Sequence, residues 1–426
     1  MLASRSLRND IFALLDIGSS KITCIIVQRY FDNYIASYRA IGFGQRRSEG
    51  VRSGMIIDFD NAEHAVRGVI GDAELTANTR VENVIIAFSS ARLNSSYFAA
   101  HVKLESGHVR LEDIKRLIIS ARQYAEREGR KLVYLNSIYY TLDGEAGIRD
   151  PKNMIGKKLS CQIHAVTSTP ASIKNLECLI ERCFLRVKSI VPTSFASAVA
   201  ATTKDEQKLG VTCIDIGADA AHIAMIYDGQ FMHTDTITVG GMALTHDIAK
   251  VLSIPLTEAE KLKILHGSVL YHNKAKSINI PQLALIPDDR KGSGSFQRDQ
   301  PEISLVDLSD ILYLRARRQL EFIKDRMEKN IIKHEFAQSI VLTGGASQLK
   351  GLHKLANEVF ECPVRIGCPP ALQELLSEYQ GPALSTVVGL SAVNEESVEM
   401  MYLNNASRPL KELYVNRVEQ WLRESF

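Results

Sequence analysis

Two distant stretches of the chain share the same order of apolar and polar positions. In each, an apolar run (residues 11–15 and 211–214) leads into Asp-Ile-Gly, which begins at Asp16 and at Asp215, and a second apolar, β-branched run follows. Short apolar runs bounded by glycine are typical of buried strands joined by tight turns. The pattern therefore predicts two related halves, each opening with a strand, a turn that carries an aspartate, and a second strand.

The same alternation of apolar segments and turn residues predicts the other elements. We expect strands at residues 34–42, 84–88, 132–140, 162–166, 222–227 and 231–239, a strand pair within 95–109, and a strand that begins at 340. Helices are expected to end near residues 75, 128, 183, 265 and 332. Asp60 is expected to cap the first helix, and Thr257, with Glu260 three residues later, the fourth.

Composition limits the class of protein. A chain of 426 residues is too long for one core and indicates two or more domains. Its 45% hydrophobic and 23% charged residues are those of an ordinary globular protein, and a net charge of +2 gives no reason to expect nucleic acid as a partner. Seven cysteines without a C-x-x-C motif favour reduced thiols over a zinc site. No apolar run approaches the roughly 18 residues that would span a bilayer.

Three turns carry candidate chemistry. Asp16 to Lys21 offers a carboxylate, a permissive glycine, two hydroxyls and a cation, which suits a phosphate cradle with Mg²⁺ near the carboxylate. A plain β-turn with a solvated lysine is the alternative. The second turn follows Asp215, and the third is Gly344-Gly345-Ala346, after an apolar run. In this order the three turns would line one cleft between the halves.

This order resembles the superfamily of actin, sugar kinases and DnaK-type ATPases. In detail the chain resembles the FtsA family of bacterial cell-division proteins, on residues 12–21, 50–58, 258–267, 340–352 and 421–426. The resemblance implies an α/β, actin-like two-domain fold, in which duplicated ribonuclease-H-like halves surround a nucleotide cleft and an FtsA-type subdomain is inserted.

The resemblance also implies domain boundaries. The first half would comprise residues 1–84 and 167–200, with the inserted subdomain for protomer contacts at 85–166. The second half would comprise 201–250 and 333–390, with a small subdomain for adenosine and the FtsZ tail at 251–332. A flexible linker at 391–407 would lead to an amphipathic membrane helix at 408–426.

Carried over residue by residue, the resemblance implies ATP and Mg²⁺ in the cleft. Asp16 and Asp215 would flank the metal through water, and Glu260 and Lys263 would contact ribose and adenine. For Glu260 and Lys263, an exposed helical ion pair is the alternative. The remaining nucleotide contacts would come from Gly18, Ser19, Ser20, Lys21, Gly217, Gly240, Gly241, Gly344, Gly345 and Ala346.

The second turn departs from the family pattern, which continues with two more glycines and a threonine. Here Ala218, Asp219 and Ala220 follow Gly217, and His222 replaces a carboxylate. The Asp219 carboxylate would repel a polyphosphate, and Ala220 lacks a hydroxyl. We therefore expect nucleotide binding with very slow or absent hydrolysis, and identify no catalytic residue.

The end of the chain predicts an amphipathic helix. Over 408–426 the apolar residues recur at spacings of three, four and seven: Leu410, Leu413, Tyr414, Val418, Trp421, Leu422 and Phe426. Trp421 is the only tryptophan, and indole favours the membrane boundary. Four basic and three acidic residues leave little net charge, so apolar burial would dominate membrane binding. A terminal helix docked on the protein body is the alternative.

The resemblance names partners and a place in the cell. The FtsZ carboxy-terminal peptide would pair with Arg315, and other copies of the chain would form a head-to-tail polymer. Inner-membrane lipid and later division proteins would also bind, at the cytoplasmic face of the septum. An actin-like pilus-assembly scaffold of the PilM type, or an ATPase or kinase of the same fold, is the alternative.

Overall fold

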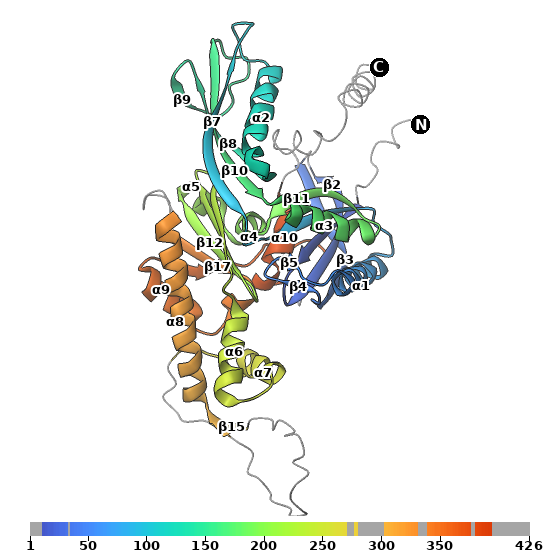
Figure 1. Cartoon of the computed structure of the whole chain (residues 1–426), viewed down its shortest axis with the longest axis vertical. Helices are drawn as coiled ribbons and strands as arrows, with labels where there is room; N and C mark the ends of the chain where they lie inside the picture. Colours follow the sequence, from blue (N-terminus) through green and yellow to red (C-terminus); the bar gives the residue numbers. More distant parts are fainter. Residues whose placement is uncertain are drawn as a thin grey trace, which may run out of the picture.

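The computed structural model describes residues 11–32, 35–270, 277–279, 302–330, 339–375 and 380–393. Two large sheets form the body of the molecule (Figure 1). A third sheet projects at one end, and α6 (Gly241–Leu252), α7 (Leu256–His266) and part of α8 (Leu305–Asn330) form the other end. The molecule therefore has a body of two sheets, an inserted unit and a helical end.

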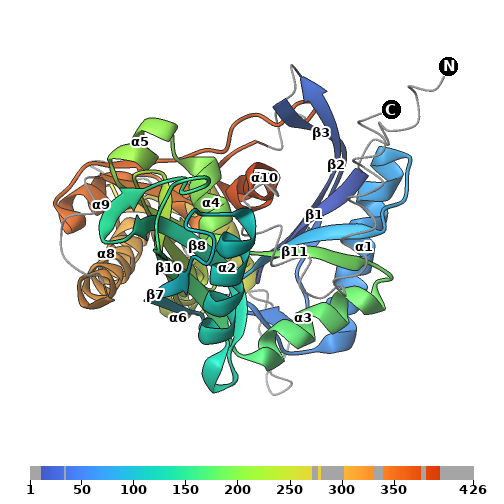
Figure 2. The same ribbon diagram turned by 90° about the horizontal axis from the view of Figure 1, so that it is seen from above.

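The first sheet has the order β11-β6-β1-β2-β3. Its strands are β1 (Ile11–Ile17), β2 (Lys21–Asp32), β3 (Ile35–Arg47), β6 (Asn83–Phe88) and β11 (Arg186–Pro192). The first three are antiparallel neighbours, whereas β6 pairs in parallel with both β1 and β11. Helices α1 (Phe59–Ala77) and α3 (Pro170–Arg182) cover its outer face (Figure 2).

The second sheet repeats this plan in the order β14-β13-β12-β17-β18. Its strands are β12 (Val211–Ile216), β13 (Ala221–Tyr227), β14 (Gln230–Ile237), β17 (Ser339–Thr343) and β18 (Val364–Ile366). Three strands again form an antiparallel meander, and two more pair in parallel. The duplicated halves that the two Asp-Ile-Gly turns predict are thus confirmed.

The inserted unit has its own sheet and core. The sheet order is β7-β10-β8-β9, from β7 (Asn94–Lys103), β8 (Lys131–Leu142), β9 (Glu145–Ile148) and β10 (Lys158–Ser168), with α2 (Leu111–Ala125) on one face. Unlike a freely hinged domain, it is bonded to the second half. The Phe231 carbonyl of β14 accepts from His164 Nδ1 at 2.8 Å and from Asn136 Nδ2 at 3.2 Å.

Two short helices, α4 (Thr193–Ala201) and α10 (Ser385–Ala392), lie between the two large sheets (Figure 2). They cross so closely that a Cβ on Gly389 would overlap the Ala196 carbonyl. Apart from α6, α7 and α8, the helical part of the second half includes α9 (Leu352–Phe360), and α5 (Lys204–Leu209) precedes β12. The sequence patterns predicted neither α4 nor α10, although both join the halves.

Some local expectations are wrong. Helix α1 is capped by Asp58, which accepts from Asn61 N at 3.1 Å, and Asp60 lies inside its first turn. Helix α7 follows Pro255 and has no side-chain cap, so Thr257 and Glu260 form no capping box. The strands expected at 222–227 and 231–239 are joined at Asp228-Gly229, where both residues have positive φ, as a two-residue hairpin requires. Residues 95–103 belong to one strand and not to a pair.

The seven cysteines are free thiols, as expected. Cys24 and Cys213 are buried within strands, where a thiol behaves as a small apolar side chain. Among the described residues, no helix is long and apolar enough to cross a bilayer.

Replacing Gly389 by alanine should reveal how much the molecule depends on the α4–α10 crossing. The new methyl must push backbone apart, so we expect a loss of about 1–3 kcal/mol in the free energy of unfolding. The matched control is Gly71→Ala in α1, where a Cβ meets nothing within 4 Å. That change should stabilise the helix by roughly 0.5–1 kcal/mol. Equal effects in chemical denaturation would contradict this account.

Candidate functional site

The first phosphate-type turn joins β1 to β2 and is closed by Gly18 N, which donates to Lys21 O at 3.1 Å. A hairpin of β4 (Val51–Arg52) and β5 (Met55–Ile56) supports it from outside the strand pair, because Ser53 N donates to Ser19 Oγ at 2.9 Å. Ser48 N donates to Ser20 O at 3.0 Å. Each of the four residues of the turn, Gly18 to Lys21, thus takes part in a hydrogen bond.

Asp16 is the penultimate residue of β1, and it interacts electrostatically with Asp215 of the second half. Burial, and then the nearby charge of Asp215, raise the pKa of Asp16 to about 7, and Lys21 opposes this shift. Burial also lowers the pKa of Lys21, although the two carboxylates oppose this. Two aspartates and one lysine thus share a confined space, an arrangement in which added positive charge is favourable.

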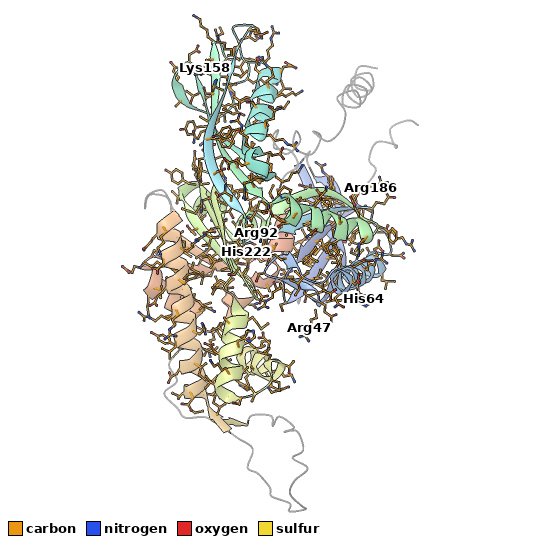
Figure 3. The ribbon with its side chains drawn as sticks, in the orientation of Figure 1. Arg47, His64, Arg92, Lys158, Arg186 and His222 are labelled. Carbon is orange, nitrogen blue, oxygen red and sulfur yellow. The ribbon has the colours of Figure 1, made fainter. Side chains whose placement is uncertain are left out.

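Asp215 lies on the face of β12 that Val211 and Cys213 share, because side chains alternate along a strand. Its Oδ2 accepts from Ser197 Oγ of α4 and, at 3.0 Å, from Thr386 Oγ1 of α10. His222 pairs with Asp215 in the β12–β13 register and lies near the centre of the molecule (Figure 3). Burial lowers the pKa of His222, with Asp215 opposing the shift, so the imidazole is neutral at neutral pH.

The second turn joins β12 to β13 and repeats the geometry of the first. Gly217 N donates to Ala220 O at 2.8 Å. The N-terminus of α6 then binds the turn, because Gly241 N donates to Gly217 O at 2.9 Å and Met242 N to Ala218 O at 2.8 Å. A Cβ on Gly240 would overlap Ala218, so only glycine permits this close approach.

Lys263 of α7 is the centre of a polar cluster behind the second turn. Its Nζ lies 2.7 Å from Glu260 Oε2, 2.8 Å from Thr245 Oγ1 and 3.1 Å from Gly241 O. Thr245 Oγ1 also donates to Glu260. The Lys263 side chain is 15% exposed and that of Glu260 is 38% exposed, so the lysine is largely buried whereas the carboxylate reaches solvent.

The third turn completes the convergence. Gly344 follows β17 with φ of 86°, and a Cβ there would overlap Asp215 Oδ1 and the Ile216 backbone. A Cβ on Gly241 would lie 2.9 Å from Ala346 Cβ and 3.7 Å from Lys263 Nζ. The second turn, the start of α6, the Lys263 cluster and the third turn are thus in direct contact. Gly345 itself is exposed.

A cavity of about 400 Å³ opens between the halves beside the second turn. Ala218 and Asp219 line it, which places the Asp219 side of this turn at the cavity, a point that the sequence could not decide. Arg52 and Ser53 line the cavity from the first half and Arg318 lines it from the second, and sequence reasoning placed none of them at the nucleotide cleft. No local pattern marks these residues.

Arg315 also lines this cavity, but its guanidinium is already paired. Nε and Nη2 donate to the two Asp247 oxygens of α6 at 2.5 and 2.6 Å. A peptide carboxylate would have to share or displace Asp247. The membrane residues expected in the tail, Leu413, Val418, Trp421, Leu422 and Phe426, lie outside the described residues, as does the 394–407 part of the linker.

Comparison with known proteins identifies the family. Residues 212–389 match the family "Cell division protein FtsA", and residues 90–167 match "SHS2 domain inserted in FTSA". Cell division protein FtsA of Agrobacterium fabrum is 35% identical over 99% of this chain and 96% of its own length. The Escherichia coli protein of that name is 29% identical, with 97% of each chain covered. The chain belongs to the FtsA family.

Solved structures of other proteins share the fold of this FtsA-family chain. A PilM–PilN type IV pilus biogenesis complex matches with a TM-score of 0.62 and 16% identity, over 89% of this chain and 97% of that one. MreB5 of Spiroplasma citri bound to ADP matches with a TM-score of 0.56 and 14% identity, over 92% and 98%. At these identities the matches show an actin-like fold alone, and the family rests on the sequence.

The raised pKa of Asp16 should appear as a pH-dependent stability. The protonated form stabilises the fold fully below the ordinary pKa of 3.8, and this contribution is lost as the pH rises through about 7. In the Asp16→Asn variant the side chain stays neutral at every pH. As the pH rises from 4 to 7, the free energy of unfolding of the wild-type FtsA-family chain should therefore fall relative to that of the variant. The slope should not exceed about 1.4 kcal/mol per pH unit.

Denaturant unfolding across this pH range measures the difference. Asp325→Asn, which changes an exposed carboxyl on α8, is the control and should track the wild type. Parallel pH profiles for Asp16→Asn and the wild type would show that Asp16 ionises normally.

Proposed function

We propose that the chain binds ATP with Mg²⁺ in the cleft between its two halves. The convergence of three turns around the Asp16–Asp215 pair carries this proposal. Gly18 to Lys21 and Gly217 to Ala220 would receive the phosphates, with Gly240 and Gly241 where the helix N-terminus meets the second turn. Glu260, Lys263 and Gly344 to Ala346 would border the nucleoside.

The residues present suit a magnesium ion. Two carboxylates share one confined space, and burial, followed by the charge of Asp215, raises the pKa of Asp16 although Lys21 opposes the shift. Mg²⁺ prefers hard oxygen ligands and retains several waters, so Asp16 and Asp215 would hold it through water. When bound, the ion would supply positive charge to the phosphates. Asp215 would be oriented by Ser197 and Thr386, and Lys21 would neutralise phosphate oxygen.

We further propose that hydrolysis is very slow or absent. The second turn has no hydroxyl, because alanine occupies positions 218 and 220. His222, across from Asp215, is buried, with its Nδ1 3.3 Å from Thr236 Oγ1. The second turn therefore offers no hydroxyl group to a water in the cleft. The cleft would then serve as a nucleotide-dependent scaffold more than as a turnover enzyme.

Calorimetry with Mg–ATP tests this proposal on two lysines of one helix. Lys263→Ala should weaken ATP binding about tenfold, since it removes the cation that holds Glu260, Thr245 and the start of α6 together. Lys261→Ala is the matched control, because Lys261 is exposed and, within the described part of the chain, its ion pair is with Glu258 at 2.8 Å. The Lys261→Ala variant should bind Mg–ATP with the affinity of the wild type.

The wild type should release phosphate from Mg–ATP no faster than the Asp16→Ala variant does. Undetectable ATP binding by the wild type would contradict the binding proposal. Release well above the Asp16→Ala rate would contradict the proposal of slow hydrolysis.

As an FtsA-family protein, the chain is proposed to tether the FtsZ ring to the cytoplasmic face of the inner membrane and to recruit later division proteins. The tail at 408–426 would bind lipid through its apolar stripe, and burial of each large side chain would contribute roughly 1.5–3 kcal/mol before ordering costs. Residues 85–166 would form protomer contacts in a head-to-tail polymer. Many weak anchors on one polymer would then hold together by avidity.

One bridging experiment tests both ends of the tether. Vesicles of phosphatidylethanolamine and phosphatidylglycerol, sedimented with the full chain, should carry down a labelled FtsZ carboxy-terminal peptide. Removal of residues 408–426 should abolish vesicle binding but leave peptide affinity in solution unchanged. Arg315→Glu should keep vesicle binding and weaken the peptide about tenfold or more.

Arg326→Glu is the control for Arg315→Glu. It breaks a similar ion pair on the same helix, since Arg326 Nε lies 2.7 Å from Asp235 Oδ2. Vesicle binding that survives the truncation would refute the tail as anchor. Equal peptide affinity in the Arg315 variant and the wild type would refute the peptide site.

A further inference from the structure

The cavity between the halves has a basic wall that the proposed nucleotide contacts leave unexplained. Arg52 reaches it from the β4–β5 hairpin of the first half, and Arg318 from α8 of the second. Within the described residues, neither guanidinium has an ion-pair or hydrogen-bond partner. Two unpaired cations on opposite halves thus face one cavity.

Charge counting shows what the cavity favours. Arg315 is neutralised by Asp247, so Arg52 and Arg318 contribute two positive charges and Asp219 one negative charge. The balance is one net positive charge, without His246, which also lines the wall. A guanidinium presents several N–H donors in a fork that matches phosphate oxygens. The cavity therefore suits an anion with several oxygens.

The cavity adjoins both phosphate-type turns. Ala218 and Asp219 of the second turn line it directly, and Ser53 of its wall donates to Ser19 of the first turn. The cavity is thus next to the second turn and one hydrogen bond away from the first. A phosphate chain that lies between the turns would end in or beside this space.

The hairpin that carries Arg52 is fixed in place. Ser53 and Gly54 have φ of 47° and 74°, the pattern of a tight two-residue hairpin turn. A Cβ on Gly54 would overlap Ser89, so the hairpin packs closely on the end of β6. Arg52 is therefore presented by a rigid support, with only its own side chain left to adjust.

We propose that Arg52 and Arg318 form a subsite for the terminal phosphate of a nucleoside triphosphate, which they bind from opposite sides of the cleft. The subsite rests on the proposed ATP function and adds discrimination between ATP and ADP. It offsets the repulsion from Asp219 in the second turn. Because the two arginines belong to different halves, the terminal phosphate holds the halves together, whereas ADP does not.

Calorimetric titration of the full chain with Mg–ATP and Mg–ADP tests the subsite. Arg52→Gln and Arg318→Gln should each weaken ATP about tenfold and change ADP less than about twofold, as expected for a charge-assisted bond to one phosphate. Arg317→Gln is the matched control, since Arg317 donates to Glu321 at 2.9 Å and to Tyr313 at 3.0 Å and does not line the cavity. It should leave both affinities unchanged.

Asp219→Asn supplies a test that misfolding cannot imitate. Removal of the negative charge should tighten ATP severalfold and ADP less. Equal losses for ATP and ADP in the arginine variants, or no loss for either, would overturn the subsite while leaving ATP binding intact. If the wild type binds neither nucleotide, the proposed function and the subsite both fail.

Discussion

The crossing of α4 and α10 is the constraint on which the cleft depends. The two helices lie between the large sheets, and Gly389 allows them to approach until backbone meets backbone. Ser197 and Thr386, one on each helix, both donate to the Asp215 carboxylate, and the two hydroxyls lie 2.8 Å apart. The helices that join the halves therefore also hold Asp215, a central residue of the candidate site, in place.

This shared structure suggests how a nucleotide could act on distant parts. A ligand that binds near Asp215 and changes the charge or position of its carboxylate also changes the hydrogen bonds from Ser197 of α4 and Thr386 of α10. The inserted unit would follow the second half, because His164 and Asn136 bond to Phe231 of β14, and Arg149 pairs with Asp228 at 2.8 Å. In a polymer built through the inserted unit, the cleft and the protomer contact would move together.

Sequence reasoning succeeded where the signal is local. The two Asp-Ile-Gly turns predicted the duplicated halves, because apolar runs and glycine fix a strand pair within about ten residues. It failed for α4 and α10, whose faces are buried nearly all round, so Ala, Ser, Thr and Val follow no amphipathic period. Helix α7 begins after Pro255 with no side-chain cap, so the capping motif at Thr257 was misleading.

In the site, too, residues with a local sequence signal were predicted and residues without one were not. Gly344 was predicted by its place after a strand, and its contact with Asp215 shows why glycine is needed there. Arg52 and Arg318 carry no local mark, since only the folded chain brings a hairpin of the first half and a helix of the second to one cavity. Asp219 lines the cavity in a turn that is bonded to the start of α6, and no sequence pattern encodes those hydrogen bonds.

Hydrogen–deuterium exchange with and without Mg–ATP tests the central claim most directly, since it reads both halves at once. A nucleotide held between the halves should slow exchange together in residues 18–21, 217–222, 240–245 and 344–346. Peptides from the far end of the inserted unit should change little and serve as the internal reference. Protection confined to one half, or no protection at saturating Mg–ATP, would contradict a nucleotide site built from both halves.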